Sequence, residues 1–74
     1  MNGVVKSVVA DKGYGFIITT DRTEYFFHKS DFTGHWMDLV NDREHGQVEV
    51  EFEVVKSPKG PRAANVKVIN EIRG

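Results

Sequence analysis

Two short aromatic segments carry the residue types that could do chemistry in this chain. Residues 12–17 read KGYGFI, and residues 25–28 read YFFH. A polar stretch at residues 21–23 separates them, which predicts two strands joined in a β-hairpin. An aromatic ring that lies on a solvent-facing sheet can stack with an unpaired nucleic-acid base.

The alternation of side chains along a strand decides which of these rings lie together. Successive residues point to opposite faces, so Tyr14 and Phe16 share one face of the first strand. On the second strand, Phe26 and His28 share a face. We therefore expect two phenyl rings, a phenol and an imidazole to form one stacking platform.

The competing interpretation is that these rings form the core, since phenylalanine is more often buried than functional. Ile17, Tyr25 and Phe27 occupy the opposite face of the same two strands and can fill a small interior by themselves. This favours a surface position for Phe16 and Phe26.

Length, composition and charge bound the remaining possibilities. The 74 residues make one small domain, and the absence of cysteine excludes disulfides, thiolate zinc sites and a cysteine nucleophile. We expect no signal peptide and no membrane span, hence a cytoplasmic protein.

Ten Lys and Arg against eleven Asp and Glu give a net charge of −1, which argues against tight nucleic-acid binding unless basic residues gather locally. The candidates for such a patch are Lys6, Lys12, Lys29, Lys59 and Arg62.

The rest of the chain reads as short strands. We expect five of them, over residues 3–9, 14–20, 24–28, 48–55 and 63–69. In the first strand, alternation puts Val5 and Val9 on one face and Lys6 and Val8 on the other. Residues 29–46 are interpreted as a long loop that contains one helical turn near residues 30–32. Residues 36–40 are too short and poorly capped for a helix. Trp36 is either an anchor of this loop or a binding residue. Five strands without a helix predict a closed antiparallel barrel, which leaves no exposed edges.

Four segments in order resemble the cold-shock domain, the small OB-fold barrel of bacterial cold-shock proteins and Y-box proteins. These segments are residues 3–6, 12–17, 26–28, and 50–54 with 60–66; residues 12–17 and 26–28 resemble the family's two ribonucleoprotein motifs. The resemblance implies an all-β, five-stranded antiparallel OB-fold barrel over residues 1–70, followed by a C-terminal tail over residues 71–74. It also implies binding of single-stranded RNA or DNA.

The resemblance also suggests roles for individual residues. Tyr14, Phe16, Phe26 and His28 would stack on bases, with Lys12 beside the phosphates and Lys6 nearby. With the flanking basic residues and the loop tryptophan, the candidate binding residues are Lys6, Lys12, Tyr14, Phe16, Phe26, His28, Lys29, Trp36, Lys59 and Arg62.

The chain also departs from the family pattern. Where the family has Trp-Phe-Asn after its Val-Lys pair, this chain has Ser7, Val8 and Val9, which removes two stacking residues. Lys29 replaces the aromatic residue that often follows the motif histidine, and a phosphate contact by Lys29 would recover part of the loss. The loop that contains Trp36 is longer than usual. We expect a reduced platform and weaker binding.

Two functions remain open at this stage. The first is a single-strand nucleic-acid-binding module that acts as an RNA chaperone or as a regulator of transcription or translation. The alternative is a degenerate cold-shock fold that acts mainly in protein–protein interaction or as a homodimer and binds nucleic acid weakly. An enzyme is not expected, because no nucleophile motif or phosphate-binding loop is present. No metal or cofactor is expected, since His28, His35 and His45 have no ligand spacing. We expect a monomer, with a homodimer as the alternative.

Overall fold

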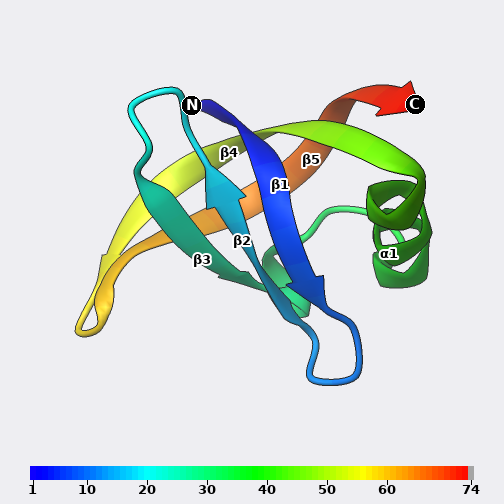
Figure 1. Ribbon diagram of the computed structural model, residues 1–74. Coiled ribbons are helices and arrows are strands. Elements are labelled where there is room, and N and C mark those ends of the chain that lie inside the picture. Colours follow the sequence, from blue (N-terminus) through cyan, green and yellow to red (C-terminus); the bar gives the residue numbers. More distant parts are fainter. Residues whose placement is uncertain (74) are drawn as a thin grey trace.

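The computed structural model describes residues 1–73, with side chains described for residues 1–70. The elements in chain order are β1 (Asn2–Val9), β2 (Tyr14–Ile18), β3 (Glu24–His28), the 3-10 turn η1 (Lys29–Asp31), α1 (Trp36–His45), β4 (Gly46–Ser57) and β5 (Gly60–Arg73). The strands form a closed barrel in the order β1-β2-β3-β5-β4 (Figure 1). The predicted five-stranded barrel is confirmed.

Strand pairing is antiparallel throughout this barrel except at one contact. β3 and β5 run parallel, with Phe26 opposite Arg62, and a parallel bridge between Phe32 and Val66 follows it. The prediction of an antiparallel barrel is therefore correct for every strand pair but β3 and β5.

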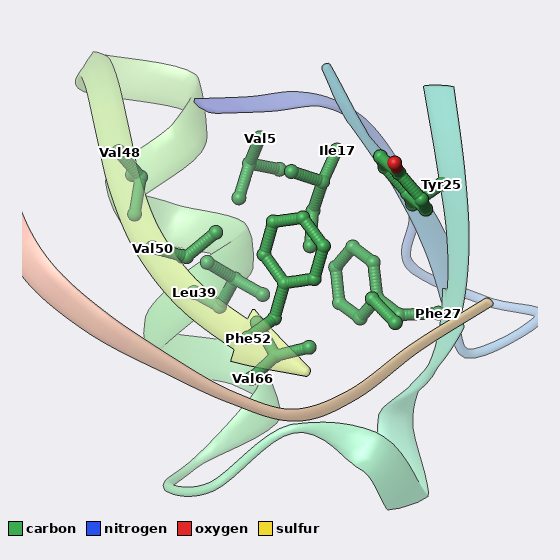
Figure 2. Packing of buried hydrophobic residues seen from close by; sticks show 10 residues of the cluster. Val5, Ile17, Tyr25, Phe27, Leu39, Val48, Val50, Phe52 and Val66 are labelled. Atoms are coloured by element: carbon green, nitrogen blue, oxygen red, sulfur yellow. The ribbon is translucent and has the colours of Figure 1, made fainter. Parts of the chain in front are cut away.

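The core lies inside the barrel and follows the alternation of the strands (Figure 2). Ile17 and Phe27 are fully buried, and Tyr25 is 8% exposed. β4 contributes alternate residues from its first half, because its other face carries glutamates. The buried apolar cluster comprises Val5, Ile17, Tyr25, Phe27, Leu39, Val48, Val50, Phe52, Ala63 and Val66.

The prediction of a long loop over residues 29–46 is wrong, because α1 occupies most of it. α1 buries Leu39 and Val40. The side chain of its N-cap residue, His35, makes no capping hydrogen bond to the first turn. The helix therefore depends on packing against the barrel and not on local capping signals, which explains why the sequence did not reveal it. No helix in the described part of the chain is long and apolar enough to cross a membrane.

The predicted faces of β1 are wrong beyond Val5. The register with β2 shifts between Val5 and Ser7, so that Lys6 is an extra, bulged residue. Val8 consequently lies against the core, while Ser7 is exposed and stands opposite Phe16. The bulge thus moves Ser7 beside the aromatic residues of β2.

β5 continues beyond residue 69, where the sequence predicted that it would end. It pairs with β4 up to Arg73, opposite Gly46. The predicted tail over residues 71–74 is therefore strand up to Arg73, and its last residue lies outside the described part of the chain.

Candidate nucleic-acid interface

Three aromatic rings gather on the outer face of β2 and β3. Tyr14 and Phe16 of β2 stand opposite His28 and Phe26 of β3. The ring centroids lie 6.0 Å apart for Tyr14 and Phe16, 5.5 Å for Tyr14 and Phe26, and 5.9 Å for Phe16 and Phe26. All three side chains are half-buried. We call Tyr14, Phe16 and Phe26 the outer aromatic cluster.

Gly15 sits between the two aromatic residues of β2 and faces inward. A Cβ atom at this position would lie 2.7 Å from the carbonyl oxygen of Ser7 and 2.9 Å from the ring of Phe27. Glycine therefore allows the inner ring of Phe27 to lie directly below the outer aromatic cluster. The sheet carries aromatic rings on both faces because this residue has no side chain.

Gly13 fixes the turn that leads into the cluster. Its φ of 72° lies in the left-handed region that favours glycine. Its amide donates to the carbonyl of Val9 at 2.9 Å, and its carbonyl accepts from the amide of Lys29 at 2.8 Å. The start of β2 is thereby tied to the residue that follows β3.

His28 joins the cluster from the end of β3 and is held by the turn after it. Its Nδ1 accepts a hydrogen bond from the amide of Ser30 at 3.2 Å, and its own amide donates to a carboxylate oxygen of Asp31 at 3.0 Å. A backbone amide can only donate, so Nδ1 is the acceptor in the contact with Ser30 and the ring N–H lies at Nε2. The imidazole can therefore present an N–H donor at Nε2 beside Tyr14.

No group of His, Asp and Glu side chains in the described residues could hold a metal ion.

Three exposed lysines flank the cluster without a carboxylate partner among the described residues. Lys12 precedes Gly13 in the β1–β2 turn, and the stem of Lys29 passes over Gly13, where a Cβ atom would meet it at 2.9 Å. Lys59 lies at the tip of the β4–β5 turn. Positive charge is thus available at two sides of the aromatic rings.

The other two predicted basic residues are already engaged in ion pairs. The Lys6 Nζ lies 3.2 Å from a carboxylate oxygen of Glu24, and both side chains are exposed. Arg62 holds Asp31 by several hydrogen bonds of 2.8–3.1 Å. Arg62 therefore joins β5 to η1, so its guanidinium is less available to a ligand than the three free lysines.

Trp36 stands apart from the outer aromatic cluster. Its ring lies 6.0 Å from that of Phe27 and 6.4 Å from that of Phe32, and its Nε1 donates to the carbonyl of Ala10 at 3.4 Å. Phe27 faces the interior, so Trp36 packs at the inner side of the sheet. The structure therefore places Trp36, one of the ten predicted residues, away from the rings.

A hollow beside Phe26 adds residues that the sequence did not suggest. It has a volume of about 510 Å³ and is lined by Phe26 and by the whole β4–β5 turn, residues 57–62. Pro58 and Pro61 make much of this lining apolar. Pro58 and Pro61, on either side of Lys59 and Gly60, could have suggested an apolar surface at this turn from the sequence. Only the closure of the barrel at Phe26 and Arg62 brings that turn beside β3.

A larger hollow lies elsewhere in the molecule. It has a volume of about 640 Å³ and is lined by Val4–Lys6 of β1 and by residues 43–47 at the end of α1. None of the outer aromatic residues borders it. We therefore place the candidate site on the β2–β3 face and not in this larger hollow.

A family model described as the 'Cold-shock' DNA-binding domain matches residues 1–69. The chain belongs to the cold-shock domain family. It is 46% identical over 70 residues to a cold shock-like protein of Aquifex aeolicus, a match that covers 93% of this chain and 94% of that protein.

Further relatives come from other bacteria. The cold shock-like protein CspC of Bacillus cereus is 42% identical over 66 residues, which cover 89% of this chain and 95% of that protein. The cold shock protein CspA of Staphylococcus aureus is 44% identical over 64 residues, which cover 86% of this chain and 91% of that protein. These matches span nearly the full length of both partners, so the family assignment applies to the whole barrel.

Proposed function

We propose that this cold-shock domain binds single-stranded RNA or DNA by stacking bases on Tyr14, Phe16 and Phe26. The observation that carries the proposal is the position of this cluster. Its rings face solvent, while a separate set of residues, among them Phe27, fills the core below them. Half-exposed rings at this density are unusual on a protein surface and are typical of contact sites.

The charged and polar groups around the rings fit the same ligand. His28 offers an Nε2 donor beside Tyr14, and the free amines of Lys12, Lys29 and Lys59 can meet phosphates. Base stacking is sequence-tolerant, because every base has a π-face. Such binding suits an RNA chaperone or a general regulator of transcription or translation in the cytoplasm.

The position of Ser7 predicts a moderate affinity. Ser7 stands opposite Phe16 on the outer face, where the cold-shock family usually has a tryptophan. One stacking contact is worth about 1–3 kcal/mol per base by alanine substitution. We therefore expect weaker binding than a complete aromatic set would give.

The test is a titration of a labelled oligopyrimidine of about seven bases, a length within the site size of one OB fold, followed by fluorescence anisotropy at low salt. The Phe16→Ala and Phe26→Ala variants should each bind about 5- to 150-fold more weakly. Ile69→Ala is the matched control, because Ile69 is an exposed apolar residue on β5 outside the cluster. Absence of binding by the unmodified protein at low salt would contradict the proposal.

A second candidate is a domain that acts mainly through protein–protein contacts. The exposed Ser7 in place of a ring and the net charge of −1 favour it. Under this function, replacing Phe16 or Phe26 by alanine would leave any residual oligonucleotide binding unchanged. The same titration therefore separates the two candidates.

A further inference from the structure

The second half of β1 has a free edge that faces α1. β4 pairs with β1 only at residues 2–4, and beyond them the described residues place no strand on that side of β1. Figure 1 shows α1 alongside this part of β1, on the side away from β2. A hollow of about 300 Å³ lies between the two elements. We call it the β1–α1 slot; it is lined by residues 6–8 and 10 on one side and by Val40, Arg43 and Glu44 of α1 on the other.

The backbone of Val8 points into this slot. The Val9 carbonyl accepts a hydrogen bond from the Gly13 amide at 2.9 Å, so the backbone groups of Val9 point toward β2. Neighbouring residues of a strand direct their backbone groups to opposite sides, so the amide and carbonyl of Val8 point toward α1. No strand and no side chain of the described residues bonds to them on that side.

α1 closes both ends of the slot. Arg43 donates to the Lys6 carbonyl at 2.7 Å, and the Nε1 of Trp36 donates to the Ala10 carbonyl at 3.4 Å. Val8 lies midway between these two closed positions and keeps both its donor and its acceptor free. An added peptide strand would need several consecutive free residues, whereas the edge of one nucleobase needs a single donor and a single acceptor.

We propose that the β1–α1 slot takes one base of the bound single strand, with the edge of that base hydrogen-bonded to the amide and carbonyl of Val8. Every nucleobase presents a donor beside an acceptor on its Watson–Crick edge. Val40, which is 8% exposed, gives the slot an apolar wall. The volume of the slot lies at the lower end of the range for small-ligand sites.

The charges at the slot favour a neutral base over a phosphate. Arg43 and Glu44 are neighbours on α1 and both border the slot, so a carboxylate offsets the guanidinium there. Lys6 also borders the slot, but its amine lies 3.2 Å from a carboxylate oxygen of Glu24. A phosphate would therefore gain no net attraction, whereas a neutral base needs none.

Ser7 connects the slot with the outer aromatic cluster. It borders the slot and stands opposite Phe16 on the exposed face. A strand with one base stacked on Phe16 can thus place a neighbouring base in the slot. This path rests on the proposed function, whereas the free backbone groups of Val8 do not depend on it.

The Val8 amide reports occupation of the slot directly. The experiment is a titration of the isotope-labelled protein with an oligopyrimidine of about seven bases, followed by amide proton–nitrogen correlation spectra. We expect the Val8 resonance to shift together with those of Tyr14 and Phe16. Shifts on β2 and β3 without a shift at Val8 would overturn the slot and leave base stacking intact.

Separate titrations with the four free nucleosides distinguish a base held by the slot alone from one that the strand delivers. A Val8 shift with a nucleoside supports the first, and a Val8 shift with the oligonucleotide only supports the second. No shift at Val8 with any of these ligands overturns the proposal, also where the oligonucleotide fails to bind at the outer aromatic cluster.

Two variants that fill the slot give a second readout. Val40→Phe should abolish the Val8 shift and weaken oligonucleotide binding about 5- to 150-fold, the effect of two ordinary hydrogen bonds. Ala10→Phe narrows the slot from an exposed position and keeps the test valid where a larger residue at position 40 disturbs packing. Met37→Phe is the matched control, because Met37 is 59% exposed on α1 and does not border the slot. Equal binding by all three variants would overturn the proposal.

Discussion

The two faces of the β2–β3 hairpin are built from the same residue types and have opposite roles. Phe27 is fully buried and packs among the core residues (Figure 2), whereas Phe26, its neighbour in the same strand, is half-buried on the outer face. Residue type therefore does not decide which aromatic residue is structural. The alternation of the strand and the closure of the barrel decide it, and the following predictions test that difference.

The largest effect is expected on the inner face. Phe27→Ala should lower the free energy of unfolding by about 3–5 kcal/mol, because it removes a large buried side chain and leaves a cavity. Phe26→Ala is the matched substitution on the outer face and should cost under about 1 kcal/mol. Urea unfolding followed by the fluorescence of Trp36, which lies against Phe27, measures both. Equal losses in the two variants would remove the distinction between the faces.

A ring added to the outer face should sharpen the comparison. Ser7 is exposed and stands opposite Phe16, so Ser7→Trp should extend the outer aromatic cluster by one stacking surface. We expect oligonucleotide affinity to rise by about 1–3 kcal/mol, with little change in stability. Asn70→Trp, at an exposed position of β5, is the control and should leave anisotropy titrations unchanged. No gain in the Ser7→Trp variant would argue against stacking at this position.

Lys12 and Lys29, which have no ion-pair partner among the described residues, and the ion-paired Arg62 should contribute differently to the salt dependence of oligonucleotide binding. Lys12→Gln or Lys29→Gln should each reduce the slope of log affinity against log salt by about 0.7, the value for one phosphate contact on a single strand. Arg62→Gln should leave the slope nearly unchanged and lower stability, because Arg62 holds Asp31. Titrations at several salt concentrations and urea unfolding distinguish these outcomes; a slope that changes most in the Arg62→Gln variant would reverse our assignment.

The smallest effect is expected at the β2–β3 turn, which belongs to neither face. A hydrogen bond from the Thr19 hydroxyl, together with the amide of Thr23, holds the pKa of the exposed Asp21 below its ordinary value. Because the folded pKa is the lower one, this stabilisation is complete at neutral pH. It is lost as the pH falls below about 4 and then through the folded value. Asp21→Asn should therefore lower the melting temperature slightly at pH 7 and not at about pH 2; a difference that persists in acid would contradict this.

The hairpin was predictable from sequence because its signals are local. The bounds of Glu24–His28 and the faces of Tyr14, Phe16 and Phe26 follow from alternation alone, and the structure has them as predicted. Whether these rings bind bases stays a prediction. Trp36 was proposed for the same site and instead anchors α1 against the core.

What could not be predicted depends on contacts between distant segments. α1 is stabilised by burial of Leu39 and Val40 on the barrel and has no strong cap, so its sequence alone gives a weak signal. The bulge at Lys6 moves the residues that follow it to the opposite faces of β1. The Lys6 carbonyl accepts a hydrogen bond from Arg43 of α1 at 2.7 Å. The pairing of Arg62 with Asp31 likewise exists only because the closed barrel brings them together.

The parallel contact between β3 and β5 also has a dynamic consequence. One residue pair of the two strands, Phe26 with Arg62, and the nearby bridge between Phe32 and Val66 close the barrel there, with the Arg62–Asp31 ion pair beside them. A seam held by so few backbone bonds should open more often than the long β4–β5 ladder, and its amides should exchange with solvent sooner. A nucleic acid that bridged Phe26 and the β4–β5 turn would span this seam and hold it shut. Ligand binding would then slow the local opening of the barrel between β3 and β5.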